Sequence, residues 1–323
     1  MRVVFAGTPE PAVVALEKLI ASEHEVVAVL TRPDAKKGRG RTLHPSPVKA
    51  LAQEHGIEVL TPERLKGNDE IKETLKKLAP DAIPVVAYGN LIPEDFLDIP
   101  VHGWINLHFS LLPRWRGAAP VQAGILHGDE YSGATTFRID AGLDTGDILL
   151  QEPELIRPDD TADDLLTRLA YSGGDLLVRT MDDLASGHAT FTPQEGEATY
   201  APKISKDDAR IDWTTHAAEI DRAIRAYTPG PGAWTTLGGD RIKVGPVATV
   251  SGDAEEPILV PGQIEVAKNA VRVGTGTTAV ELKMIQPAGK KMMPAADWAR
   301  GLQDTESTGD TESNGATEGV RFE

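Results

Sequence analysis

The chain has 323 residues and a mass of 34.6 kDa, which is close to the limit of a single hydrophobic core, so two domains are expected. Its net charge of −16 argues against a protein that coats nucleic acid without specificity. It has no cysteine, which excludes disulfides and a thiol nucleophile, and no membrane-spanning run or secretory signal, so a cytoplasmic protein is expected.

The N-terminal part of the chain alternates short, unbroken apolar strands with helices. Strands separated by helices form βαβ units, and these build a parallel sheet that is covered on both faces. Ligands of such sheets bind beyond the carboxyl ends of the strands, so Gly7, Ala87–Gly89 and His108 are expected in one crevice. The expected strands cover residues 2–6, 26–30, 59–60, 82–87, 101–108 and 134–139, and the expected helices cover residues 9–22, 47–55, 68–78, 118–127 and 161–186.

The turn after the first strand, residues 7–9, lacks the G-x-G-x-x-G pattern of a dinucleotide-binding loop. Thr31 and Arg32 stand at the end of the second strand, where such proteins carry an acid, so a hydride-transfer enzyme fits poorly. The loop that follows is basic, with six Lys and Arg residues against one acid over residues 32–49. Such a cluster is either a solvated loop or a site for an anion or RNA.

The stretch over residues 105–149 gathers polar side chains that suit carbonyl chemistry. Asn106 and His108 lie two positions apart on one strand, so they point to the same face, and a Gly-rich turn over residues 142–147 then carries Asp144. An amide and an imidazolium supply two donors for a developing oxyanion, and a carboxylate helps to remove a proton. This set predicts acyl transfer to an amine, with Asp144 holding His108 in its charged form.

Other kinds of catalytic site fit the sequence less well. Ser110 follows His108 closely, but no G-x-S-x-G elbow marks it as an activated nucleophile. Direct attack by an acceptor amine is therefore favoured over a covalent acyl-enzyme. The sequence has no H-x-x-x-H pair and no acid cluster at ligand spacing, so no metal site is expected.

The C-terminal part of the chain predicts a second, mostly β domain. A polar segment with proline and glycine over residues 190–208 suits a linker, and an amphipathic helix is expected over residues 213–226. Short strands between glycines and prolines then indicate a small barrel of the OB type. Residues 303–323 are acidic and poor in apolar side chains, as is typical of a disordered tail. The expected strands cover residues 234–237, 242–250, 262–266, 270–273 and 280–285.

Several of these motifs together resemble the 10-formyltetrahydrofolate-dependent formyltransferases. In the central stretch the resemblance rests on Asn106-x-His108, Ser110-Leu-Leu-Pro113 and Gly142-Leu-Asp144-Thr-Gly146. It covers residues 1–302, and the basic loop and appended domain are similar to the tRNA-directed members of the family. Further matching segments are FAGTP at 5–9, GRG at 38–40, PSPVK at 45–49, VAYG at 86–89, RWRGAAP at 114–120, KISK at 203–206, ARIDW at 209–213 and QPAGKK at 286–291.

The resemblance implies an α/β fold with two domains. A Rossmann-like, parallel-sheet catalytic domain would occupy residues 1–189, followed by a linker over residues 190–208. An OB-like, tRNA-binding domain would occupy residues 209–302, and residues 303–323 would form the acidic tail. The implied reaction moves the formyl group of 10-formyltetrahydrofolate to the α-amine of methionyl initiator tRNA and leaves tetrahydrofolate. A monomer is expected.

The family's catalytic and folate-binding roles carry over residue by residue. Asn106, His108 and Asp144 match the catalytic trio. One departure is Phe109, because the family usually has glycine at this position, and a bulky side chain there must find room behind the strand or change the folate pocket. The residues that match the folate pocket are Ala87, Tyr88, Gly89, Ser110, Leu111, Leu112 and Pro113.

The implied contacts with tRNA lie in two basic segments. The loop with Lys37, Arg39 and Arg41 matches the insertion that reaches the acceptor arm of the tRNA. The C-terminal domain, with residues that begin in the linker, would hold the inside of the tRNA. Those residues are Lys203, Lys206 and Arg210.

Two other interpretations stay open at this point. A formyltransferase could act on a small amine such as an amino-sugar nucleotide, although the basic loop and the appended domain speak against it. The chain could instead be an inactive module that binds folate or tRNA, although such a module does not need the intact Asn106, His108 and Asp144 set.

Overall fold

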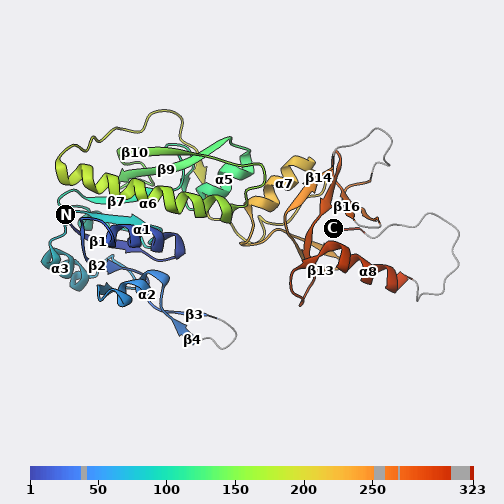
Figure 1. Ribbon diagram of the computed structural model, residues 1–323, viewed down its shortest axis with the longest axis horizontal. Helices are drawn as coiled ribbons and strands as arrows, with labels where there is room; N and C mark the ends of the chain where they lie inside the picture. The colour runs from blue at the N-terminus through green and yellow to red at the C-terminus, as the bar shows by residue number, and fades with distance from the viewer. Residues whose placement is uncertain (38–41, 251–258, 268–269, 307–320) are drawn as a thin grey trace. The chain divides into compact units, whose positions relative to one another are not determined.

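The computed structural model describes residues 1–37, 42–250, 259–267, 270–306 and 321–323 (Figure 1). The chain forms two compact units, and each unit is made of several stretches of sequence. The first takes residues 1–121, 130–156 and 164–202, and the second takes residues 122–129, 157–163 and 203–323. Within the described part of the chain, no helix has both the length and the apolar character that crossing a membrane requires.

A seven-stranded sheet forms the centre of the first unit, in the order β10-β9-β7-β6-β1-β2-β5. The five strands from β7 to β5 are parallel, as predicted, whereas β9 and β10 extend the sheet in the antiparallel sense. The edge strand β10 was not predicted, because its sequence ILLQEPEL carries Gln, Glu and Pro in place of a continuous apolar run. The strands are β1 (Arg2–Gly7), β2 (Glu25–Leu30), β5 (Glu58–Leu60), β6 (Ile83–Val86), β7 (Trp104–His108), β9 (Tyr131–Arg138) and β10 (Ile148–Leu155).

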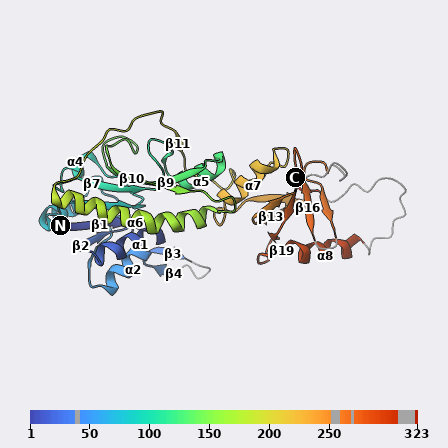
Figure 2. The ribbon, with the colours of Figure 1, turned by 45° about the horizontal axis from the view of Figure 1, so that its top comes forward.

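Helices cover this sheet on both faces. Val4 of β1 belongs to one buried cluster with Leu75 of α3 and Phe96 of α4. On the other face α6 passes so close to β7 that a side chain at Gly173 would lie 3.1 Å from Leu107. Figure 2 shows α1 next to α6 along the sheet, in agreement with the ion pair that joins these two helices. The helices of this unit are α1 (Glu10–Ile20), α2 (Pro47–Glu54), α3 (Asp69–Leu78), α4 (Glu94–Leu97) and α6 (Ala162–Ser186), of which the first two residues belong to the second unit.

The basic segment after β2 contains a hairpin, where a loop was expected. β3 (Ala35–Lys37) pairs in the antiparallel sense with β4 (Thr42–His44). Arg39 and Arg41 lie outside the described residues. The hairpin leads into α2, and Ser46 caps this helix as predicted, because its hydroxyl oxygen accepts a hydrogen bond from a backbone N–H of the first turn at 3.0 Å.

The second unit contains two four-stranded antiparallel sheets around one core, in agreement with the predicted small β-domain. Two of the expected strands are each split in two, because the chain passes from one sheet to the other at Gly245-Pro246 and at Lys283. The first sheet consists of β12 (Trp234–Leu237), β13 (Asp240–Val244), β18 (Met284–Gln286) and β19 (Met293–Pro294), and the second consists of β14 (Val247–Thr249), β15 (Ile264–Val266), β16 (Val271–Gly274) and β17 (Ala279–Leu282).

Helices complete the core of the second unit. α7 (Ala217–Ala226) is shorter than the helix that was expected, and α8 (Ala295–Glu306) was not predicted. Most of α5 (Pro120–His127) belongs to this unit as well, although it lies in the middle of the sequence assigned to the catalytic domain. Leu126 of α5 packs against the same core as the strands, so the contiguous domain boundaries expected from the sequence need this correction.

The predicted disordered tail is wrong at both of its ends. Its first residues, up to Glu306, belong to α8, and residues 307–320 lie outside the described part of the chain. Near the other end, Phe322 is 2% exposed and stacks between Trp213 and Trp298, with ring centroids 5.5 and 5.9 Å away. The acidic composition of the segment concealed this contact, because one aromatic side chain is enough to dock a short segment into a core.

The expected linker also needs correction over most of its length. Residues 190–202 belong to the first unit, where they add backbone hydrogen bonds to its sheet and loops. Thr192 forms a bridge with Ile148, and β11 (Tyr200–Ala201) pairs with β8 (Arg116–Gly117). This segment is therefore part of the first unit rather than a spacer.

Candidate active site

His108 ends β7 and is almost completely buried, with 6% of its surface exposed. Its backbone register between β6 and β9 sends its side chain to the same face as Asn106, while Leu107 between them faces α6. The imidazole Nε2 lies 2.9 Å from the carbonyl oxygen of Trp115. Because a carbonyl oxygen only accepts, Nε2 carries the proton, and the lone pair of a neutral ring lies on Nδ1.

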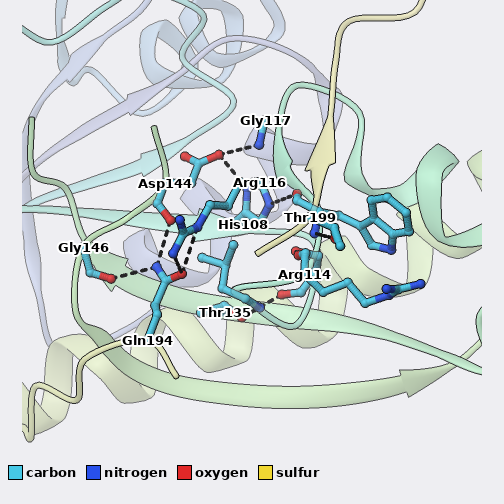
Figure 3. A network of polar contacts seen from close by, with 12 residues as sticks. His108, Arg114, Arg116, Gly117, Thr135, Asp144, Gly146, Gln194 and Thr199 are labelled. Atoms are coloured by element: carbon cyan, nitrogen blue, oxygen red, sulfur yellow. Dashed lines mark hydrogen bonds and ion pairs between the residues drawn. The ribbon is translucent and has the colours of Figure 1, made fainter. Parts of the chain in front are cut away.

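Asp144 reaches the histidine from the Gly-rich turn that precedes β10 (Figure 3). Its Oδ2 accepts a hydrogen bond of 2.7 Å from the Gly117 N–H and lies 3.8 Å from Nδ1 of His108. The residue has a φ of 54°, a left-handed conformation that only asparagine, aspartate and glycine adopt readily. The turn therefore holds the carboxylate beside the histidine by its left-handed backbone conformation and one short hydrogen bond.

The surroundings of His108 bear on the charge that the sequence predicts for it. Burial lowers the pKa of His108, while the nearby Asp144 carboxylate and the hydrogen bond to Trp115 act in the opposite direction without overcoming it. This direction opposes the standing imidazolium that was expected, and because Nε2 donates to the Trp115 carbonyl, a neutral ring carries no proton on Nδ1. The same atom can instead accept a proton, and Asp144 then faces the imidazolium that forms.

Asn106 presents the donor that this arrangement lacks. Its side chain is half-buried, and no side chain or backbone group of the described residues forms a hydrogen bond with its amide. It shares the face of β7 with His108, as predicted. The amide N–H is thus available for a developing negative charge next to the basic nitrogen of the histidine.

The Ser110–Pro113 segment forms a tightly bonded loop after β7. The Ser110 hydroxyl donates to the carbonyl of Arg114 at 2.6 Å, so it is not an activated nucleophile. Thr135 of β9 donates to the Ser110 carbonyl at 2.6 Å, and Gln151 of β10 donates to the Leu112 carbonyl at 2.9 Å. Because Ser110 and Leu112 are buried, Leu111 and Pro113 are the parts of this predicted folate segment with exposed side-chain surface.

The second predicted folate segment, Ala87–Gly89, follows β6. Ala87 and Gly89 are exposed and have left-handed φ values of 46° and 83°. The Tyr88 side chain instead belongs to the buried cluster of the unit, and its carbonyl accepts a hydrogen bond from Thr8 at 2.9 Å. A ligand at this segment would meet backbone atoms rather than the tyrosine ring. Phe109 is only 9% exposed, so its bulky side chain finds room inside the unit.

Comparisons with known proteins agree with this geometry. The profile of the formyl transferase family matches residues 1–181, and that of the formyl transferase C-terminal domain matches residues 203–303. A methionyl-tRNA formyltransferase of Corynebacterium aurimucosum is 66% identical over 319 residues, which cover 95% of this chain and 96% of the relative. One of Thermobifida fusca is 56% identical over 313 residues, which cover 96% of this chain and 100% of the relative. The chain belongs to the methionyl-tRNA formyltransferase family.

Solved structures of formyltransferases share this fold at low sequence identity. A methionyl-tRNA formyltransferase from Clostridium thermocellum aligns with a TM-score of 0.55 and 18% identity, covering 78% of this chain and 95% of that chain. An N-formyltransferase from Helicobacter canadensis, solved with folinic acid and dTDP-3-aminofucose, aligns with a TM-score of 0.67 and 19% identity, covering 88% of this chain and 98% of that chain. At such identities the likeness shows the fold of the formyltransferase family alone.

The structure adds residues to the formyltransferase site that the sequence did not suggest. Gln194 and Thr199 come from residues 191–201, called the strap below, which was expected to be linker. Gln194 contacts Arg116 and the Asp144 turn, and Thr199 contacts the segment that receives His108. No sequence signal marks these two residues, because their segment has neither strand nor helix periodicity.

The predicted tRNA-binding residues are only partly described. Lys37 ends β3, whereas Lys203, Lys206 and Arg210 are exposed in the second unit. The guanidinium of Arg210 lies 5.6 Å from the ring centroid of Trp234. The structure adds Arg241, whose guanidinium lies 3.9 Å from the same ring. Among the described residues, no group of His, Asp and Glu side chains is arranged to hold a metal ion.

Proposed function

We propose that this protein transfers the formyl group of 10-formyltetrahydrofolate to the α-amine of methionyl initiator tRNA. The observation that carries the chemistry is the set of Asn106, His108 and Asp144, with the Asp144 carboxylate 3.8 Å from Nδ1 of His108. Identity of 66% to a methionyl-tRNA formyltransferase over nearly the whole chain supports the same acceptor. The exposed basic residues of both units support an RNA substrate in spite of the acidic composition.

The three side chains have separate roles in the proposed reaction. The Asn106 amide donates to the formyl oxygen, which gains negative charge as the amine attacks. Neutral His108 accepts at Nδ1 the proton that leaves the amine, and Asp144 stabilises the resulting imidazolium. The acceptor amine attacks directly, because the Ser110 hydroxyl is already donated to a backbone carbonyl. As the bond between the formyl carbon and N10 of the folate breaks, the His108 imidazolium returns its proton to N10, so that tetrahydrofolate leaves and His108 is neutral again.

The surface around the two predicted folate segments fits a formyl donor of the folate type. Gly89 is exposed and has no side chain, so its backbone is accessible to the polar edge of a pterin ring. Two large apolar side chains are unusually exposed: Leu91, two residues after Gly89, at 78%, and Leu143, next to Asp144, at 59%. Exposed leucines next to polar backbone are typical of a site that binds a flat, partly apolar ligand.

Trp234, Arg210 and Arg241 form a platform that suits RNA. Trp234 is half-buried, and the two guanidinium groups lie over its ring. In the pairing of β12 with β13, Thr236 stands opposite Arg241, which puts Trp234 and Arg241 on the face turned away from the core residue Thr235. A tryptophan ring with two guanidinium groups over it holds these cations where they can bind the phosphates of an RNA.

Removing this platform is expected to weaken tRNA binding and its salt dependence. Replacing both Arg210 and Arg241 with alanine should lower the affinity about tenfold at moderate salt and reduce the slope of log K against log[salt] by about 1 to 2. Filter binding of methionyl initiator tRNA between low and moderate salt measures both quantities. Arg300→Ala, which removes an exposed arginine paired with Asp297, serves as the control and should change neither. An unchanged slope in the double variant would show that these cations do not contact phosphates.

Formyl transfer to a panel of acceptors tests the proposed function. The acceptors are methionyl initiator tRNA, the same tRNA without methionine, methionyl elongator tRNA and an amino-sugar nucleotide, each with 10-formyltetrahydrofolate. Transfer is expected to the charged initiator tRNA and to none of the others. Transfer to the amino sugar alone would leave the chemistry standing and replace the acceptor. Binding of folate and tRNA without transfer to any acceptor would indicate a binding module.

A further inference from the structure

The strap, residues 191–201, is bonded to both segments that hold the catalytic groups. At its start, the backbones of Thr192 and Ile148 exchange hydrogen bonds of 2.8 and 2.9 Å, directly after the Asp144 turn. At its end, the Thr199 hydroxyl accepts a hydrogen bond of 2.9 Å from the N–H of Trp115, the residue whose carbonyl receives His108. The strap thus spans the distance between the carboxylate turn and the histidine's support.

Gln194 lies between these two ends with every polar atom of its amide in use (Figure 3). Its Nε2 donates to the carbonyls of Asp144 and Gly146 at 2.8 and 2.9 Å. Its Oε1 accepts from Nη2 and Nε of Arg116 at 2.7 and 3.1 Å. The guanidinium only donates and the carbonyls only accept, so this orientation of the amide is fixed by its partners.

The two bonds of Nε2 fall on the part of the turn where the backbone is strained. Asp144 itself has the left-handed φ of 54°, which is unfavourable for a side chain with a Cβ. Such a conformation persists only where the surroundings hold it. The carboxylate is held separately, through the Gly117 N–H, and Gly117 is the neighbour of Arg116 in β8. Both residues of β8 therefore support Asp144: Gly117 bonds directly to its carboxylate, and Arg116 supports its backbone through Gln194.

We infer that Gln194 is a positioning residue for Asp144 and that Arg116 orients the Gln194 amide for this task. The pair keeps the Asp144 carboxylate at its place beside Nδ1 of His108. The inference rests on the proposed function, because it assigns a purpose to the strap in formyl transfer. It also gives a role to Arg116 of the RWRG motif, whose guanidinium donates hydrogen bonds to Gln194.

Gln194→Ala tests this inference by a measurement that does not depend on activity. Because the Asp144 carboxylate raises the pKa of His108 against the effect of burial, a displaced carboxylate should let that pKa fall further. NMR of histidine-labelled protein, with the His108 signal assigned by its loss in His108→Gln, should show a lower midpoint in Gln194→Ala than in the natural chain. An unchanged midpoint overturns the inference, whether or not the protein formylates tRNA.

Kinetics of formyl transfer give the second readout. Gln194→Ala is expected to lower kcat about 10- to 100-fold with little change in KM, since a shift of about 1 Å in a catalytic group costs up to about 100-fold. In a chain that already carries Asp144→Asn, the same change should have almost no further effect on kcat, because both act through one carboxylate. Independent, multiplying effects would overturn the positioning role. Glu195→Gln, an exposed neighbour, is the control and should match the natural chain.

A second variant guards against a simple loss of folding. Arg116→Lys keeps the charge but cannot bind Oε1 through two N–H groups, so it should shift the His108 midpoint and kcat in the same direction by a smaller amount. Thermal unfolding of each variant shows whether the unit remains folded. If both variants are folded and keep the His108 midpoint and the kcat of the natural chain, the strap has no role in catalysis.

Discussion

Replacing Asp144 with asparagine is expected to lower kcat/KM for formyl transfer about 10³-fold. The carboxylate lies 3.8 Å from Nδ1 of His108 and is the group that stabilises the imidazolium once the amine proton has moved. An amide of the same shape keeps the hydrogen bond from the Gly117 N–H but carries no charge. Loss of a group in general acid–base catalysis costs about 10² to 10⁴ in rate. Single-turnover transfer to methionyl initiator tRNA measures the effect.

Asparagine is chosen so that the variant differs from the natural chain in charge and not in backbone conformation. Asparagine tolerates the left-handed φ of 54° as aspartate does, so the turn can retain its backbone. Asp147→Asn is the matched control, because this partly exposed residue of the same turn pairs with Arg138 only at 3.7 Å. Its activity should stay within about twofold of the natural chain, in line with the small energies of surface pairs. Equal losses in both variants would assign the effect to the turn and not to the carboxylate.

Replacing His108 with glutamine is expected to lower kcat/KM by a similar factor, about 10³. Glutamine can still donate to the Trp115 carbonyl, but it has no basic nitrogen in the place of Nδ1. His102→Gln, a half-buried histidine just before β7, is the control and should leave kcat/KM unchanged. If His108→Gln retained natural activity, the base would have to be sought in another group.

The protonation of His108 decides whether it acts as a base or as a charged donor. Because burial lowers its pKa, its NMR midpoint in the free protein should lie below the ordinary value of 6.5. The folded state then binds the proton less readily than the unfolded chain, so the contribution of His108 to stability is present above pH 6.5 and is lost as the pH falls through the lower midpoint. A midpoint above 6.5 would restore the imidazolium and give His108 the role of an oxyanion donor.

Much of the catalytic site is predictable because its signals are local. Asn106 and His108 lie on one face because side chains alternate along a strand, and the glycines on both sides of Asp144 predict a turn there. The parallel strands follow from the alternation of apolar runs and helices. These features depend on neighbours within a few residues, so a single sequence contains the information.

The remaining features depend on contacts between distant segments. Burial lowers the pKa of His108, and no local sequence pattern records that burial. Gln194 reaches Asp144 across 50 positions of sequence from a segment without periodicity, and Phe322 docks onto Trp213 and Trp298 from an acidic stretch. The antiparallel edge strand β10 was missed because Gln, Glu and Pro interrupt its apolar residues. In each case the composition of the segment does not predict its structure, because that structure depends on contacts with a distant segment.

The interleaved course of the chain limits how this enzyme can be dissected. Leu126 packs against the core of the second unit and its carbonyl accepts a hydrogen bond from Arg222 at 3.2 Å, while Arg225 donates to the carbonyl of Asp160 at 3.0 Å. Leu126 and Asp160 come from the middle of the sequence, far before the last segment of that unit begins at Lys203. A fragment that starts at Lys203 therefore lacks two pieces of its own interior, and a fragment that ends at residue 189 lacks Gln194. No single cut yields two self-sufficient halves, so separate roles for the units are better studied by point substitutions in the intact chain.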